Sequence, residues 1–134
     1  MNSRKIKILV VDDELDFLET IVKRLERRGF NAFGVSSGKA ALEYLETNDV
    51  DVIVLDVRMP GMDGIEVLKE VVTKWPLVQV ILLTGHGSLE AGRRGLELGA
   101  YDYVLKPAKL EDLIKKIQQA FERKILLEQT QTER

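Results

Sequence analysis

The sequence has no cysteine, few aromatic residues and no long apolar stretch. Without cysteine, a disulfide framework, a Cys-containing zinc site and a thiol nucleophile are all excluded. The apolar run at residues 6–11 is too short for the core of a signal peptide, and no run approaches the roughly 20 residues of a membrane-spanning helix. We therefore expect a cytoplasmic protein that does not enter a membrane.

An excess of positive charge is also lacking. Twenty basic residues against 22 acidic ones give a formal charge of -2, so no overall electrostatic attraction to nucleic acid is expected. With 134 residues, 45% of them apolar and 31% charged, the composition is that of one ordinary globular domain. Direct binding of nucleic acid by this segment is not expected.

Apolar runs rich in β-branched residues alternate with segments of helical spacing. The runs at residues 6–11, 31–35, 50–55, 79–83 and 103–105 predict strands. Helices are predicted from near residue 15 and at residues 38–46, 65–75, 88–98 and 109–127. Five strand-then-helix units predict an α/β fold, with a doubly wound parallel sheet covered on both faces.

Polar side chains follow four of the predicted strands. Asp12 and Asp13 come after the first strand, Asp56 after the third, Thr84 after the fourth and Lys106 after the fifth. Ligands of open α/β sheets bind beyond the carboxyl ends of the strands, so these groups are expected at one edge. Singly, each has an ordinary alternative, because an Asp can cap a helix and a Thr or Lys can belong to a solvated turn.

Together, three carboxylates at one edge repel one another unless a cation lies among them. Mg2+ suits such a site, since it binds carboxylate oxygens and keeps room for water and a substrate phosphate. A carboxylate can then attack phosphorus when cations neutralise the transferring oxygens. If the third strand is central, Asp56 is the acceptor, with Lys106 and Thr84 as the cation and the hydroxyl donor.

Four sequence motifs resemble those of one family, the receiver domains of two-component response regulators. They are VVDDE at 10–14, LDVRMPGMDG at 55–64, LTG at 83–85 and GAYDYVLKP at 99–107. The resemblance covers residues 5 to about 124 and implies a flavodoxin-like (βα)5 fold with strand order 2-1-3-4-5. It divides the chain into a receiver domain at 5–124 and a helical extension or linker at 125–134.

The resemblance also implies roles for individual residues. Asp56 corresponds to the phosphoacceptor, and Thr84 and Lys106 to the groups that bind the phosphoryl oxygens. Asp13 corresponds to a direct Mg2+ ligand, Asp12 to a ligand acting largely through water, and the backbone carbonyl of Arg58 to a further ligand alongside Asp56. Tyr103 corresponds to the switch aromatic, and the bond between Lys106 and Pro107 is cis in the family.

The partner implied is a sensor histidine kinase or a phosphotransfer domain, and the response is a changed surface around the fourth helix, fifth strand and fifth helix. Arg58 and His86 are expected to tune the lifetime of the phosphoryl group. The lone His86 could also suggest a catalytic base or a metal ligand, but a solvated loop histidine is the better interpretation. The segment at 84–87 is common in receivers of nitrogen-regulation-class activators. The output and the cognate kinase are not specified by the sequence.

Two helix positions differ from the usual receiver pattern, and the last helix is longer than the predicted sheet requires. Gly92 and Gly95 occupy helix positions where receivers usually have alanine, either to make the helix pliant or to let it pack closely on the sheet. The apolar residues at 125–127 extend the last helix beyond what a short strand can cover. Three explanations stay open: a homodimer promoted by phosphorylation, a linker into a further domain, or a fraying end.

Two other functions share this architecture. A Mg2+-dependent phosphatase of the haloacid dehalogenase type needs a second Asp two residues after its nucleophile, but Arg58 and Glu14 stand at those positions. A flavodoxin-like FMN carrier needs a hydroxyl- and glycine-rich phosphate loop, where this chain has acidic residues. The sequence therefore favours a signalling phosphoacceptor over an enzyme or a flavin carrier.

Overall fold

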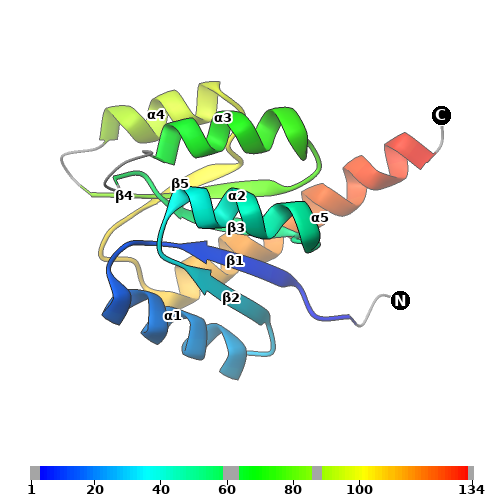
Figure 1. Ribbon diagram of the computed structural model, residues 1–134. Coiled ribbons are helices and arrows are strands. Elements are labelled where there is room, and N and C mark those ends of the chain that lie inside the picture. Colours follow the sequence, from blue (N-terminus) through cyan, green and yellow to red (C-terminus); the bar gives the residue numbers. More distant parts are fainter. Residues whose placement is uncertain (1–3, 59–63, 86–88, 133–134) are drawn as a thin grey trace.

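A computed structural model describes residues 4–58, 64–85 and 89–132 of the chain. Its strands and helices alternate along the sequence (Figure 1). The strands are β1 (Lys7–Val11), β2 (Asn31–Val35), β3 (Val52–Asp56), β4 (Gln79–Thr84) and β5 (Asp102–Leu105). The helices are α1 (Leu15–Arg27), α2 (Gly38–Thr47), α3 (Gly64–Lys74), α4 (Leu89–Glu97) and α5 (Leu110–Thr132).

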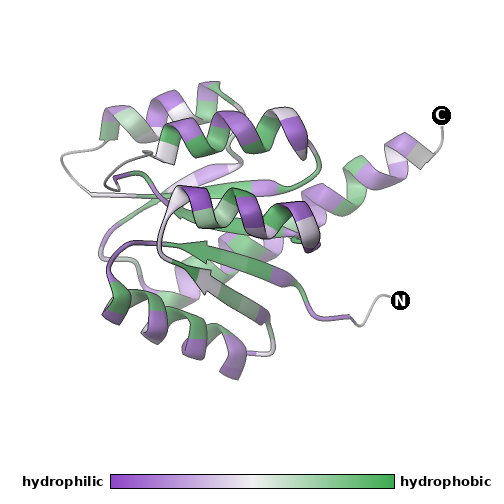
Figure 2. Cartoon of the chain, in the orientation of Figure 1, coloured by the Kyte–Doolittle hydropathy of each residue, from purple (hydrophilic) through white to green (hydrophobic). Residues whose placement is uncertain are grey.

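The five strands form one parallel sheet in the order β2-β1-β3-β4-β5, which confirms the strand order implied by the resemblance. Its central strands are buried along their whole length, as the unbroken apolar runs predicted. One core joins the sheet to α1 and α5, and a second core joins it to helices α2 and α3, with α4 packed beside them. Figure 2 shows apolar strands between helices whose outer faces are hydrophilic.

Helix α4 packs closely on the sheet because of its two glycines. A Cβ at Gly95 would lie 2.1 Å from Cδ1 of the buried Leu82, and one at Gly92 would lie 3.2 Å from both Thr84 and Tyr103. A side chain at either position would therefore press on β4 or β5. This geometry favours close packing as the reason for the glycines over a pliant helix.

Helix α5 is longer than predicted. It runs without interruption through the expected boundary at residue 125 to Thr132, and its 23 residues correspond to about 34 Å. Leu110, Ile114, Ile117 and Phe121 pack on the core, as their spacing predicted. Beyond them Leu126 is 63% exposed, so part of the extension has apolar surface facing solvent.

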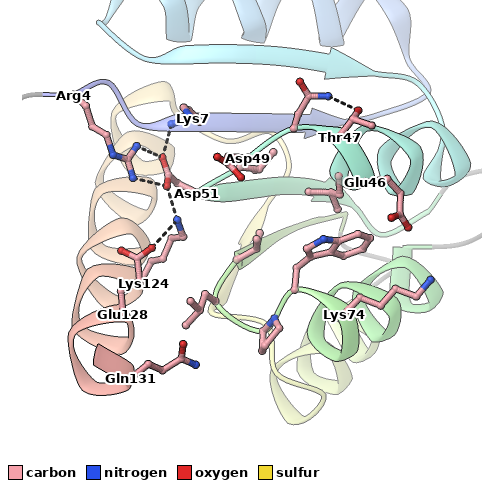
Figure 3. Close-up of a pocket in the computed structure, with 17 residues that line it drawn as sticks. Arg4, Lys7, Glu46, Thr47, Asp49, Asp51, Lys74, Lys124, Glu128 and Gln131 are labelled. Carbon is pink, nitrogen blue, oxygen red and sulfur yellow. Dashed lines mark hydrogen bonds and ion pairs between the residues drawn. The ribbon is translucent and has the colours of Figure 1, made fainter. Parts of the chain in front are cut away.

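The second half of α5 is tied to the sheet by the buried carboxylate of Asp51 (Figure 3). This contact lies at the edge of the sheet opposite the carboxyl ends of the strands. Asp51 is 2% exposed and accepts hydrogen bonds from both Nη atoms of Arg4 (2.7 and 2.8 Å), from the backbone N–H of Lys7 (2.8 Å) and from Nζ of Lys124 (2.8 Å). Burial raises the pKa of Asp51, but these donors outweigh it and lower the pKa to about 2.

Within residues 4–58, 64–85 and 89–132, no helix combines the length and the apolar composition needed to cross a membrane.

Candidate functional site

The polar residues predicted from the strand ends meet at the carboxyl edge of the sheet. β1 leads into Asp12, β3 ends in Asp56 and β4 ends in Thr84, and Lys106 follows β5. The parallel sheet places β1, β3 and β4 side by side, so their carboxyl ends converge. The bond between Lys106 and Pro107 is cis, as the resemblance implied.

Three carboxylates form the centre of this edge. Ligand atoms of Asp12, Asp13 and Asp56 all lie within 4.8 Å of one another. Asp12 is fully buried and Asp56 is 7% exposed, whereas Asp13 faces solvent. Neither Asp12 nor Asp13 is the N-cap of α1, because that position belongs to Glu14, whose backbone N–H donates to Asp12 Oδ1 (2.9 Å). The helix-cap alternative for the acidic pair is therefore wrong.

The ammonium of Lys106 lies next to these carboxylates. Its Nζ donates to Oδ2 of Asp12 (3.1 Å) and lies 3.5 Å from Oδ1 of Asp56 and 3.7 Å from Oε1 of Glu14. Burial lowers the pKa of Lys106, but the hydrogen bond to Asp12 and the nearby negative charges outweigh burial and raise it. Lys106 is therefore charged at neutral pH, and its ammonium lies within 3.5 Å of carboxylate oxygens of both Asp12 and Asp56.

Burial and nearby charges both act on the pKa of Asp56, and their effects do not all have the same direction. Burial raises its pKa, the charge of Asp12 raises it further, and the ammonium of Lys106 opposes the rise. The backbone N–H of Arg58 donates to Oδ1 of Asp56 (3.3 Å). A Cβ at Gly64 would lie only 2.5 Å from the carbonyl oxygen of Asp56, so a glycine is required where α3 begins beside this residue.

Thr84 has a buried hydroxyl that finds no hydrogen-bond partner among the described residues. The side chain is 1% exposed, and its Oγ1 has no hydrogen bond to any part of the chain that the structure describes. An unsatisfied buried hydroxyl costs about 1–3 kcal/mol, which a ligand oxygen at the site would offset. Tyr103 is half-buried on β5, and Gly92 of α4 adjoins both residues.

The structure thus brings together Asp12, Asp13, Asp56, Lys106 and Thr84. Arg58 lies directly beside them through its backbone, while His86 falls outside the described residues. Two contacts of Lys106 were missed by the sequence reasoning, those with Glu14 and with the ring of Phe17. Only the position of Glu14, directly after the acidic pair, could have suggested the first.

The donor set fits a hard divalent cation. Three carboxylates that crowd together without full cationic compensation are the oxygen ligands that Mg2+ takes in proteins, and the exposed Asp13 leaves the site open to solvent. A single Lys106 ammonium does not balance the charge of Asp12, Asp13 and Asp56, so a bound cation is electrostatically favoured.

Comparison with known proteins identifies this arrangement. Residues 8–118 match the family profile described as "Response regulator receiver domain". Among curated relatives, a putative NtrX-like response regulator of Rickettsia bellii (strain RML369-C) is 34% identical over 119 residues, which cover 87% of this chain and 25% of the relative. The transcriptional regulatory protein ZraR of Escherichia coli (strain K12) is 36% identical, covering 84% of this chain and 26% of that protein. The chain thus spans about a quarter of the length of these relatives.

Solved structures agree with the sequence relatives. A response regulator receiver domain protein from Clostridium thermocellum superimposes with a TM-score of 0.87 at 38% identity, covering 91% of this chain and 98% of that one. NtrX from Brucella abortus gives a TM-score of 0.91 at 29% identity, over 97% of this chain and 30% of that one. The fold, the carboxylate cluster and the family profile lead to one conclusion: the chain belongs to the response regulator receiver domains, the signalling phosphoacceptor modules of two-component systems.

Proposed function

We propose that Asp56 accepts a phosphoryl group from a phosphohistidine of a sensor histidine kinase or of a phosphotransfer domain, in a Mg2+-dependent reaction. The observation that carries this proposal is the convergence of Asp12, Asp13 and Asp56 within 4.8 Å, next to the Lys106 ammonium. Asp56 is the acceptor among the three because it ends the central strand β3 and keeps some exposure to solvent. Asp12 is fully buried and already accepts hydrogen bonds from Lys106 and from the backbone N–H of Glu14, and Asp13 lies on the exposed loop after β1.

In the proposed transfer, one bond to phosphorus forms as another breaks. A carboxylate oxygen of Asp56 forms a bond to phosphorus as the bond between phosphorus and the donor imidazole nitrogen breaks, and that nitrogen keeps the electron pair. The product is an aspartyl-phosphate. With a small acyl phosphate as donor, the leaving group is the carboxylate, and charge is conserved without any proton transfer.

Mg2+ would be held by Asp13 and Asp56 directly, by Asp12 largely through water and by the backbone carbonyl of Arg58. When bound, the ion supplies positive charge to the transferring oxygens. Lys106 neutralises one phosphoryl oxygen, since its ammonium already lies 3.5 Å from Asp56. The unpaired hydroxyl of Thr84 donates to another, which gives this buried group the partner it lacks among the described residues.

The same hydroxyl links the site to the surface. When Thr84 turns toward the phosphoryl group, it leaves space that Tyr103 fills by rotating inward between β4 and α4. The phosphoryl group shifts this two-state equilibrium because it binds one arrangement better than the other. The surface that changes is formed by α4, β5 and α5, where Leu89, Leu96 and Leu105 are exposed.

Signalling through that surface needs a partner. One candidate is a second copy of this chain, in a homodimer whose formation is promoted by phosphorylation.

Residues 5–124 form the receiver unit and residues 125–134 a helical extension or linker. A relative named as the DNA-binding transcriptional regulator NtrC of Klebsiella pneumoniae matches over 24% of its length. Within this segment itself we propose a cytoplasmic signalling role, without direct contact to nucleic acid or membrane and with no catalysis beyond its own phosphorylation and dephosphorylation.

Arg58 and His86 would set how long the phosphoryl group survives, because side chains over the pocket block or orient the attacking water. Unchanged decay rates of the phosphorylated protein in the Arg58→Ala and His86→Ala variants would remove both residues from this role.

The proposed phosphorylation is tested by incubating the protein with acetyl phosphate, with Mg2+ or with excess EDTA. Intact-mass measurement is expected to show one added phosphoryl group only with Mg2+, and none in Asp56→Asn. Full uptake by Asp56→Asn, or none by the wild type with ample donor and Mg2+, would contradict the proposal.

A further inference from the structure

Lys106 is in contact with an aromatic ring as well as with carboxylates. Its Nζ lies 5.1 Å from the centroid of the Phe17 ring, while Asp12, Asp56 and Glu14 accept its charge at 3.1, 3.5 and 3.7 Å. A cation within about 6 Å of a ring centroid is attracted by the negative face of the ring. The ammonium is therefore held by one aromatic and three acidic groups that come from the β1–α1 region and from β3.

Phe17 is fixed where it can hold this contact. It belongs to the first turn of α1, is half-buried, and packs against the core that joins α1 and α5 to the sheet. Lys106 reaches the same place from the loop between β5 and α5, on the far side of β4 and β3 from β1. The long lysine stem thus crosses the strand ends, and the rigid ring lies near its charged end.

The carboxylates alone do not define one position for the ammonium. Three acceptors between 3.1 and 3.7 Å offer several ways to share three N–H donors, and the lysine side chain is still 24% exposed to water. Lysine side chains lose considerable rotamer entropy when they are ordered. A neighbouring ring removes positions that the acidic groups would leave open, and it shields one flank of the ammonium from solvent.

We propose that Phe17 is a positioning residue for phosphoryl transfer: its ring orients Lys106 so that the ammonium meets the oxygens of the phosphoryl group arriving at Asp56. This inference rests on the proposed function of Asp56. In this role Phe17 acts only through Lys106.

The experiment compares rates of phosphorylation by acetyl phosphate in the presence of Mg2+, where acetate leaves as Asp56 is phosphorylated. Phe17→Leu keeps an apolar side chain but removes the π face, and we expect its second-order rate constant to fall about two- to fivefold. Phe17→Tyr keeps the π face and should restore the rate to near that of the wild type. A merely structural role would not separate Tyr from Leu in this way if both variants unfold at the same urea concentration.

The chain contains a matched control. The ring of Phe121 lies 5.1 Å below the guanidinium of Arg4, at the opposite edge of the sheet. Phe121→Leu therefore removes an equivalent cation–π contact without touching Lys106, and it should leave the phosphorylation rate unchanged. Should Phe17→Leu fail to fold, Phe17→Met supplies an unbranched apolar side chain without a ring for the same comparison.

A double-mutant cycle isolates the route through Lys106. In the Lys106→Ala background, Phe17→Leu should have little further effect on the rate, because the ammonium that the ring positions is gone. Equal rates for Phe17→Leu and the wild type, equal losses in Phe17→Leu and Phe17→Tyr, or full additivity with Lys106→Ala would each overturn the inference. Phosphorylation of wild type on Asp56 with any of these results leaves the proposed function standing, whereas no uptake by the wild type overturns both.

Discussion

Asp51 and Asp56 lie at opposite ends of the central strand β3, and each faces cations at its own edge of the sheet. Asp51, directly before the strand, binds Arg4 and Lys124, while Asp56, its last residue, faces Lys106. Both carboxyls are buried, yet the pKa of Asp51 is lowered to about 2 and that of Asp56 is raised. The carboxylate of Asp51 already accepts four hydrogen bonds and serves a structural role. The carboxylate of Asp56 is less fully compensated and can still bind a ligand.

Because the pKa of Asp51 is lowered on folding, its stabilising effect should be present above its ordinary pKa near 3.8 and lost as the pH falls toward 2. The shift corresponds to about 2 kcal/mol. At neutral pH, Asp51→Asn should lower the free energy of unfolding by about 1.5–3 kcal/mol, since it removes the buried, charged acceptor of the hydrogen bonds from Arg4, Lys7 and Lys124.

Urea unfolding of wild type and Asp51→Asn at several pH values measures this difference, which should narrow from pH 5 downward. The exposed Asp49 provides the control, and Asp49→Asn should change the stability by about 0.5 kcal/mol or less. A gap between wild type and Asp51→Asn that stays constant between pH 7 and pH 3 would rule out the ionised anchor.

Lys106 should couple phosphorylation to the switch more than it stabilises the fold, because its side chain is partly exposed and its ammonium faces the carboxylates of the site. Lys106→Ala should remain folded but lose the amide chemical-shift response around Tyr103 when a phosphoryl mimic such as beryllofluoride is added with Mg2+. Lys109→Ala, at an exposed lysine of the same loop, should respond as the wild type does. A full response in Lys106→Ala would refute this role.

Gly95→Ala should destabilise the protein even though alanine favours helices. The new Cβ would lie 2.1 Å from Cδ1 of Leu82, which is fully buried on β4 and has little room to move. We expect overpacking to cost about 1–3 kcal/mol and helix propensity to contribute roughly 1 kcal/mol in the other direction, which leaves a net loss of up to about 2 kcal/mol. Arg93→Ala, at an exposed position of α4, should have little effect. A stabilised Gly95→Ala variant in thermal unfolding would show that α4 is pliant instead.

Phosphorylation should promote self-association through the α4, β5 and α5 surface and the extension of α5, where Leu126 is exposed. Sedimentation with and without beryllofluoride is expected to show more dimer with the mimic, and Leu126→Glu should reduce that dimer. Gln118→Glu places the same charge at an exposed polar position of α5 and serves as the control. A monomer in both states would leave the extension as a linker or a fraying end.

Most strands, helices and site residues could be predicted from the sequence because the patterns that mark them lie within short segments. Runs such as residues 79–83 mark strands by composition, and the polar residues after four of the five runs mark the functional edge. Ends of elements were less accurate: β3 begins at Val52 instead of residue 50, and α5 continues to Thr132. Tertiary contacts decide these boundaries, such as the anchoring of Lys124 on Asp51.

Contacts between distant residues could not be predicted. Nothing local indicates that Asp51 meets Arg4 and Lys124, or that the ring of Phe17 reaches Lys106, because these pairs form only once the sheet and α5 are assembled. Likewise, Gly92 and Gly95 were recognised as unusual, but the choice between pliancy and close packing required the distance to Leu82. Strand order came from family resemblance, since periodicity carries no information on it.

The phosphoryl group on Asp56 can be located chemically. Protein treated with acetyl phosphate and Mg2+ is reduced with borohydride, which converts an aspartyl-phosphate to homoserine, and the modified residue is identified by mass spectrometry of peptides. Phosphorylation of Asp56 should give homoserine at position 56 and nowhere else, with no modification when Mg2+ is withheld. Homoserine at position 12 or 13, or none at 56 in protein whose intact mass shows the added phosphoryl group, would contradict it.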